Sequence, residues 1–105
     1  MAHVMDAQST VAAFVDDHDL DATPEYRLLD LVSEVGELAK DGATSAAYGR
    51  SPADFAVASD EIGDLYFALL AFADAMNVDA EAGLHEALQK YEARIDRHGS
   101  PTSPE

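Results

Sequence analysis

An apolar pattern with the period of an α-helix runs from residue 55 to residue 76 and leaves few folds open to this chain. Its large apolar side chains recur in steps of three, four and seven residues: Phe55, Ile62, Leu65, Leu69, Phe72 and Met76. Residues 65–73 are apolar on nearly every side, which is typical of a helix surrounded by other helices. Because no stretch alternates apolar and polar residues as a half-buried strand does, the pattern predicts an all-α protein.

Capping residues divide the chain into further helices. Proline directly after threonine or serine, at residues 23–24 and 51–52, is typical of the first turn of a helix. Asp79 is another candidate cap, and Gly42 and Gly99 stand where helices would end. These signals predict four helices: residues 6–17, 24–41, 52–76 and 79–98. We expect a four-helix bundle-like domain over residues 1–98, followed by a disordered tail over residues 99–105.

The first and last helices carry apolar stripes that we expect to face the bundle core. The stripes are Val11, Phe14 and Val15 on the first helix, and Leu84, Leu88, Tyr91 and Ile95 on the last. A chain of this size buries only about two thirds of its unfolded surface, so its core is small. Phe67 and Leu70 also lie outside the main stripe of the central helix. We therefore expect the chain to assemble as a dimer or tetramer.

Acidic residues dominate the composition. There are 21 Asp and Glu against 6 Lys and Arg, which gives a formal net charge of -15. Such a charge repels phosphate backbones and anionic lipids, so we expect neither nucleic acid nor a membrane as a partner. The many aspartates and only two lysines resemble proteins of salt-loving organisms, in which salt screens the repulsion between acids.

Cysteine is absent, so the sequence offers no disulfide framework and no thiolate nucleophile. The first ten residues lack the charged and apolar regions of an export signal. No apolar run approaches the roughly 20 residues that a membrane span requires. These features predict a cytoplasmic protein.

Two acid pairs with the same spacing are the candidate metal ligands. Glu34 and Glu37 lie on the second predicted helix, and Glu61 and Asp64 lie on the third. A step of three residues keeps both carboxylates of a pair on one side of a helix. Because neighbouring helices with a short connection pack antiparallel, the two pairs can face each other. Four converging carboxylates suit Mg²⁺ or Mn²⁺.

The alternative interpretation is that these acids belong to solvated helix surfaces. On the second helix this interpretation holds, because its acids form one stripe opposite an apolar stripe. On the third helix Glu61 and Asp64 continue a sector of small apolar residues instead. Two acids in such a place are costly without a partner, and basic residues are few, which favours a cation there.

The acid pairs also resemble a known family. Residues 28–40 read LLDLVSEVGELAK and residues 60–70 read DEIGDLYFALL. These segments are similar to the all-alpha nucleoside triphosphate pyrophosphohydrolases of the MazG type, whose signature is E-x-x-E, a spacer and E-x-x-D. The resemblance covers roughly residues 23–97 and includes Lys90 on the closing helix. This sequence differs from many relatives in two ways. They carry an asparagine shortly after this lysine, whereas this sequence has Arg94 at the corresponding place, and the tryptophans that stack on the base in some relatives are absent.

The resemblance implies an Mg²⁺-dependent enzyme that hydrolyses a nucleoside triphosphate to the monophosphate and pyrophosphate. Glu34, Glu37, Glu61 and Asp64 would hold the metal, and Glu37 is our candidate for holding the attacking water. Family members are generally dimers or tetramers. Such an enzyme would clear noncanonical or excess nucleotides. The alternatives are an enzyme like phosphoribosyl-ATP pyrophosphatase, which has similar acid pairs, and a noncatalytic helical interaction protein.

Basic residues on the last predicted helix are candidates for binding the phosphates. Lys90 and Arg94 are four residues apart, and Arg97 follows as a weaker candidate. Cations there could offset the negative charge that develops on pyrophosphate. Their alternative role is the ordinary enrichment of basic residues near the C-terminus of a helix.

Overall fold

A computed structural model of the chain describes residues 6–102, and every regular element in that range is helical. The elements are α1 (Ala7–Asp17), α2 (Pro24–Ser45), the short 3₁₀ turns η1 (Ala47–Gly49) and η2 (Pro52–Asp54), α3 (Ser59–Ala75) and α4 (Ala80–His98). The predicted all-α class is confirmed. Residues 1–5 of the predicted domain and 103–105 of the predicted tail lie outside the described residues. No helix among residues 6–102 is long and apolar enough to cross a membrane.

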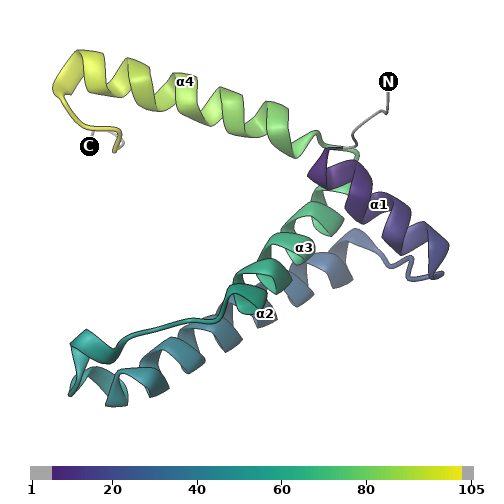
Figure 1. The fold of residues 1–105 in the computed structure, drawn as a ribbon. Helices are drawn as coiled ribbons and strands as arrows, with labels where there is room; N and C mark the ends of the chain where they lie inside the picture. Colours follow the sequence, from purple (N-terminus) through teal and green to yellow (C-terminus); the bar gives the residue numbers. More distant parts are fainter. Residues whose placement is uncertain (1–5, 103–105) are drawn as a thin grey trace, which may run out of the picture.

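The helices α2 and α3 form an antiparallel pair, and α1 lies against α3 (Figure 1). Small residues on α3 make close packing possible, since Ala68, Ala71 and Ala73 are all buried. Phe14 on α1 meets the ring of Phe67 edge-on, with the ring centres 5.9 Å apart. Leu70 is buried, with 4% of its surface exposed. Phe67 and Leu70 therefore pack inside the chain, and our expectation that they point to an oligomer interface is wrong.

The fourth helix does not complete a bundle within one chain. Figure 1 shows α4 running away from α2 and α3, with which it makes no extensive contact. The stripe predicted to be buried is about half exposed: Leu84 56%, Leu88 47%, Tyr91 39% and Ile95 48%. Helical periodicity correctly found the stripe, but periodicity cannot tell whether a stripe is covered by the same chain or left open.

The direction of α4 is set by the turn that precedes it. Asn77 adopts a left-handed conformation with φ 57°, which asparagine tolerates better than most residues. The Gln8 side chain then donates to the carbonyl of Val78 at 2.7 Å and accepts from the backbone N–H of Ala80 at 2.8 Å. Asp79 caps α4 by accepting from the Ala82 N–H. A side chain from α1 thus holds the connection between α3 and α4.

Two predicted helix boundaries are wrong for one shared reason. Helix α2 continues past Gly42 to Ser45, and α3 begins at Ser59 rather than at residue 52. Gly42 is buried because the Phe55 ring lies on it, and a Cβ there would come within 2.7 Å of that ring. The Ser45 hydroxyl also accepts from the Ala56 N–H at 2.9 Å. These contacts tie residues 55–58 to the end of α2, so these residues do not join α3.

Candidate metal centre

The antiparallel packing of α2 and α3 places Glu34 within electrostatic reach of two other predicted ligands, Glu37 and Asp64. Partial burial of Glu34 is the main cause that raises the pKa of its carboxyl above the ordinary value. The negative charges of Glu37, Asp64 and Asp30, and a hydrogen bond with Glu37, raise this pKa further. Residues of both acid pairs are therefore within electrostatic reach of each other, as the spacing predicted.

The fourth predicted ligand, Glu61, has a different closest neighbour. Its pKa is raised above the ordinary value mainly by a hydrogen bond with the carboxyl of Asp41, which an accepted hydrogen bond from Ala58 partly offsets. As carboxylates both groups only accept, so one proton must be shared for this bond to form. The Oε2 atom of Glu61 has less than 1 Å² of exposed surface. When Glu61 is ionised, no group donates a hydrogen bond to this oxygen. Such an oxygen needs either a proton or a cation.

Asp41 is the acid that our selection of ligands missed. It lies four residues after Glu37, in the acidic stripe of α2 that the sequence assigned to solvent. The step of four residues, which places Asp41 one turn beyond Glu37, was the available signal. Asp41 lies within α2, on the helix that packs against α3, and there it meets the carboxyl of Glu61.

Glu61 also has a structural role. Its Oε1 accepts from the backbone N–H of Ala58 at 3.2 Å, as a glutamate in the first turn of a helix often does. This bond accounts for one carboxylate oxygen. It leaves Oε2 without a partner, so capping alone does not explain why an ionised glutamate is placed here.

The carboxylates thus form two adjacent groups rather than one closed site. Glu34, Glu37 and Asp64 make up one group, and Asp41 and Glu61 make up the other. Among residues 6–102, no three acidic or histidine side chains are positioned to hold one metal ion as they stand. The oxygen donors and the orphaned Glu61 Oε2 suit a hard divalent cation, but holding one would require side chains of the two groups to turn toward each other.

The predicted phosphate-binding residues lie away from both acidic groups. Lys90 and Arg94 are on α4, which has no extensive contact with α2 or α3. The Lys90 ammonium lies 5.6 Å from the centre of the Tyr91 ring, and the Arg94 guanidinium donates to the carbonyl of Pro101 at 3.2 Å. One chain by itself does not bring these cations to the carboxylates.

Comparison with known proteins adds no further assignment. No family model matches the chain, and no curated protein or solved structure is significantly similar to it. The functional argument therefore depends on the residues themselves.

Proposed function

We propose that this chain is an Mg²⁺-dependent nucleotide pyrophosphohydrolase that converts a nucleoside triphosphate to the monophosphate and pyrophosphate. The observation that carries the proposal is the mutual influence of Glu34, Glu37 and Asp64, which come from two acid pairs on antiparallel helices. The orphaned oxygen of Glu61 beside Asp41 supports it, because a cation would offset the repulsion between these two carboxylates. The protein would act in the cytoplasm as a homo-oligomer.

The metal would be held by Glu34, Glu37, Glu61 and Asp64, with Mn²⁺ as an alternative to Mg²⁺. When bound, such an ion polarises phosphoryl oxygens and lowers the pKa of a bound water. Glu37 is exposed whereas Glu34 is half-buried, so Glu37 is better placed to hold a water that attacks phosphorus from solvent. No nucleophilic side chain is required for this reaction.

Lys90 and Arg94 would offset the charge on the phosphates and on the leaving pyrophosphate. Because α4 extends away from α2 and α3 in a single chain, their contact with substrate depends on how α4 is placed in the assembled protein.

The test is pyrophosphate release from a panel of ribo- and deoxyribonucleoside triphosphates, with Mg²⁺, Mn²⁺ or EDTA, at low and molar KCl. We expect metal-dependent release of pyrophosphate that leaves the monophosphate. Glu34→Gln and Asp64→Asn should each lower kcat by more than the roughly 10–100-fold that loss of an outer-shell partner of a metal costs, because each removes a ligand itself. Asp54→Asn is the matched control, because it removes one exposed carboxylate outside both acidic groups.

The alternatives give different results in the same assay. Hydrolysis of phosphoribosyl-ATP without hydrolysis of free triphosphates would identify the related pyrophosphatase. A noncatalytic interaction protein would release no pyrophosphate from any substrate, and added Mg²⁺ would not raise its melting temperature. Either result would refute the proposed function.

A further inference from the structure

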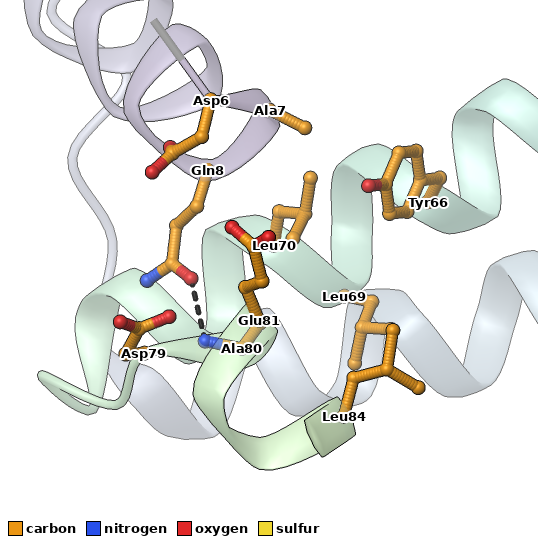
Figure 2. A pocket seen from close by; sticks show the side chains of 10 residues that line it. All are labelled: Asp6, Ala7, Gln8, Tyr66, Leu69, Leu70, Asp79, Ala80, Glu81 and Leu84. Atoms are coloured by element: carbon orange, nitrogen blue, oxygen red, sulfur yellow. Dashed lines mark hydrogen bonds between the residues drawn. The ribbon is translucent and has the colours of Figure 1, made fainter. Parts of the chain in front are cut away.

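A pocket of about 460 Å³ lies where the starts of α1 and α4 meet α3. Figure 2 shows its lining, which takes side chains from all three helices. Much of this lining is apolar, since Leu70 is buried and Leu69 and Leu84 are about half exposed. Small-molecule pockets in proteins have volumes of roughly 300–1,000 Å³ and are mostly apolar with a few polar groups. This pocket is therefore large enough for a small organic molecule.

The shape of the pocket is held by Gln8. Its side chain donates to the carbonyl of Val78 and accepts from the N–H of Ala80, and Figure 2 shows the second of these bonds. Both ends of the amide are thus used within the chain, so Gln8 shapes the pocket and does not bind a ligand. A pocket whose walls are already ordered loses less conformational entropy when a ligand enters it.

Two polar groups in the pocket are open to a ligand. Figure 2 shows the Glu81 side chain and the Tyr66 hydroxyl directed toward the space around Leu70. Within residues 6–102, neither of these two side chains has a hydrogen-bond or ion-pair partner. An ionised carboxylate can only accept hydrogen bonds, and a phenol hydroxyl can also accept one. The apolar lining is therefore combined with two acceptors, which suits a ligand that donates.

The net charge around the pocket decides the sign of that ligand. Asp6 and Asp79 cap the two helices that begin here, accepting from the N–H groups of Ser9 and Ala82. Each helix N-terminus carries about half a positive charge, so the two together contribute about one. Asp6, Asp79 and Glu81 contribute three negative charges, and no basic residue lines the pocket. About two negative charges remain uncompensated, which attracts cations and repels anions.

We propose that this pocket binds a small organic ammonium ion with an apolar body, such as an arylalkylamine. The apolar body lies against Leu69, Leu70 and Leu84. The ammonium group, which has three N–H donors, donates to the Glu81 carboxylate and to the Tyr66 hydroxyl oxygen. None of the candidate metal ligands lines this pocket, so the inference does not depend on the proposed enzymatic activity.

The test is isothermal titration calorimetry with three probes that share a phenyl group but differ in charge: 2-phenylethylamine, 2-phenylethanol and 3-phenylpropionate. We expect the protonated amine to bind roughly 10-fold or more tightly than the alcohol, because a hydrogen bond between charged groups is the stronger one. The carboxylate probe should not bind. Molar KCl should weaken binding of the amine and leave the alcohol unchanged, since salt screens only the charged contact. No binding of the amine at low salt, or equal affinity for amine and alcohol, would overturn the proposal.

Two variants locate the binding within the pocket. Glu81→Gln keeps the shape of the side chain but removes its charge, and it should weaken binding of the amine roughly 10-fold or more without changing that of the alcohol. Tyr66→Phe removes only the hydroxyl and should weaken the amine less. Glu86→Gln is the matched control, because Glu86 is an exposed glutamate of α4 outside the pocket lining.

The control variant should keep the wild-type affinity, and circular dichroism should show the same helical content in all three variants. Wild-type affinity for the amine in Glu81→Gln would overturn the proposal. An equal loss in Glu81→Gln and Glu86→Gln would overturn it as well, since it would show a general attraction of cations to an acidic surface.

Discussion

Leu70→Ala tests whether α1 covers α3 as the structure indicates. Leu70 is 4% exposed, so the substitution loses nearly all of the transfer free energy of a buried leucine side chain and leaves a cavity. Substitutions of this kind destabilise proteins by about 2–5 kcal/mol. Leu70 also lines the pocket at the start of α1, where neighbouring side chains can relax, so we expect about 3 kcal/mol for this site. In a domain of this size that lowers the melting temperature by roughly 12–24 °C.

The assay is thermal and urea unfolding followed by circular dichroism, at one fixed protein concentration because association also stabilises the folded state. Leu29→Ala is the control for the same chemical change at an exposed position, and it should alter stability by less than about 0.5 kcal/mol. If Leu70→Ala destabilises the protein no more than Leu29→Ala does, α1 does not cover this part of α3 in solution, and the reasoning is refuted.

Three further predictions follow from single contacts. Gln8→Leu removes both hydrogen bonds to the turn before α4 and should cost about 1–3 kcal/mol in unfolding free energy, measured by urea titration; no loss would mean that Gln8 does not hold this turn. Gly42→Leu should lower the melting temperature, because its side chain would displace the Phe55 ring, whereas the same change at the unobstructed Gly36 should raise it. In EDTA, Glu61→Gln should raise the melting temperature at pH 7 and keep the bond from the Ala58 N–H. The pKa of Glu61 is raised by folding, so its contribution to stability is present below the ordinary carboxyl pKa and lost as the pH rises. The gain in melting temperature should therefore vanish below about pH 4. An equal gain at pH 7 and below pH 4 would contradict the raised pKa of Glu61.

Several parts of the candidate site could be predicted from the sequence. The E-x-x-E and E-x-x-D spacings place each pair on one side of a helix, and a short connection makes the two helices antiparallel, which is enough to bring Glu34 near Asp64. The pairing of Asp41 with Glu61 is not contained in these two spacings. The step of four residues from Glu37 to Asp41 places Asp41 on the same side of α2, but only the packed helices show which acid Glu61 meets.

The sequence by itself determined that this chain is helical and where most of its helices begin, because capping residues and apolar periodicity act within a few turns of one segment. The tertiary structure alone decided which apolar stripes are covered. Phe67 and Leu70 are covered by α1, whereas the stripe of α4 stays open. The physical reason is that the direction of α4 depends on a left-handed Asn77 and on Gln8, which is 72 residues away from the Ala80 N–H that it binds. Interactions over such a distance leave no periodic signal in a sequence.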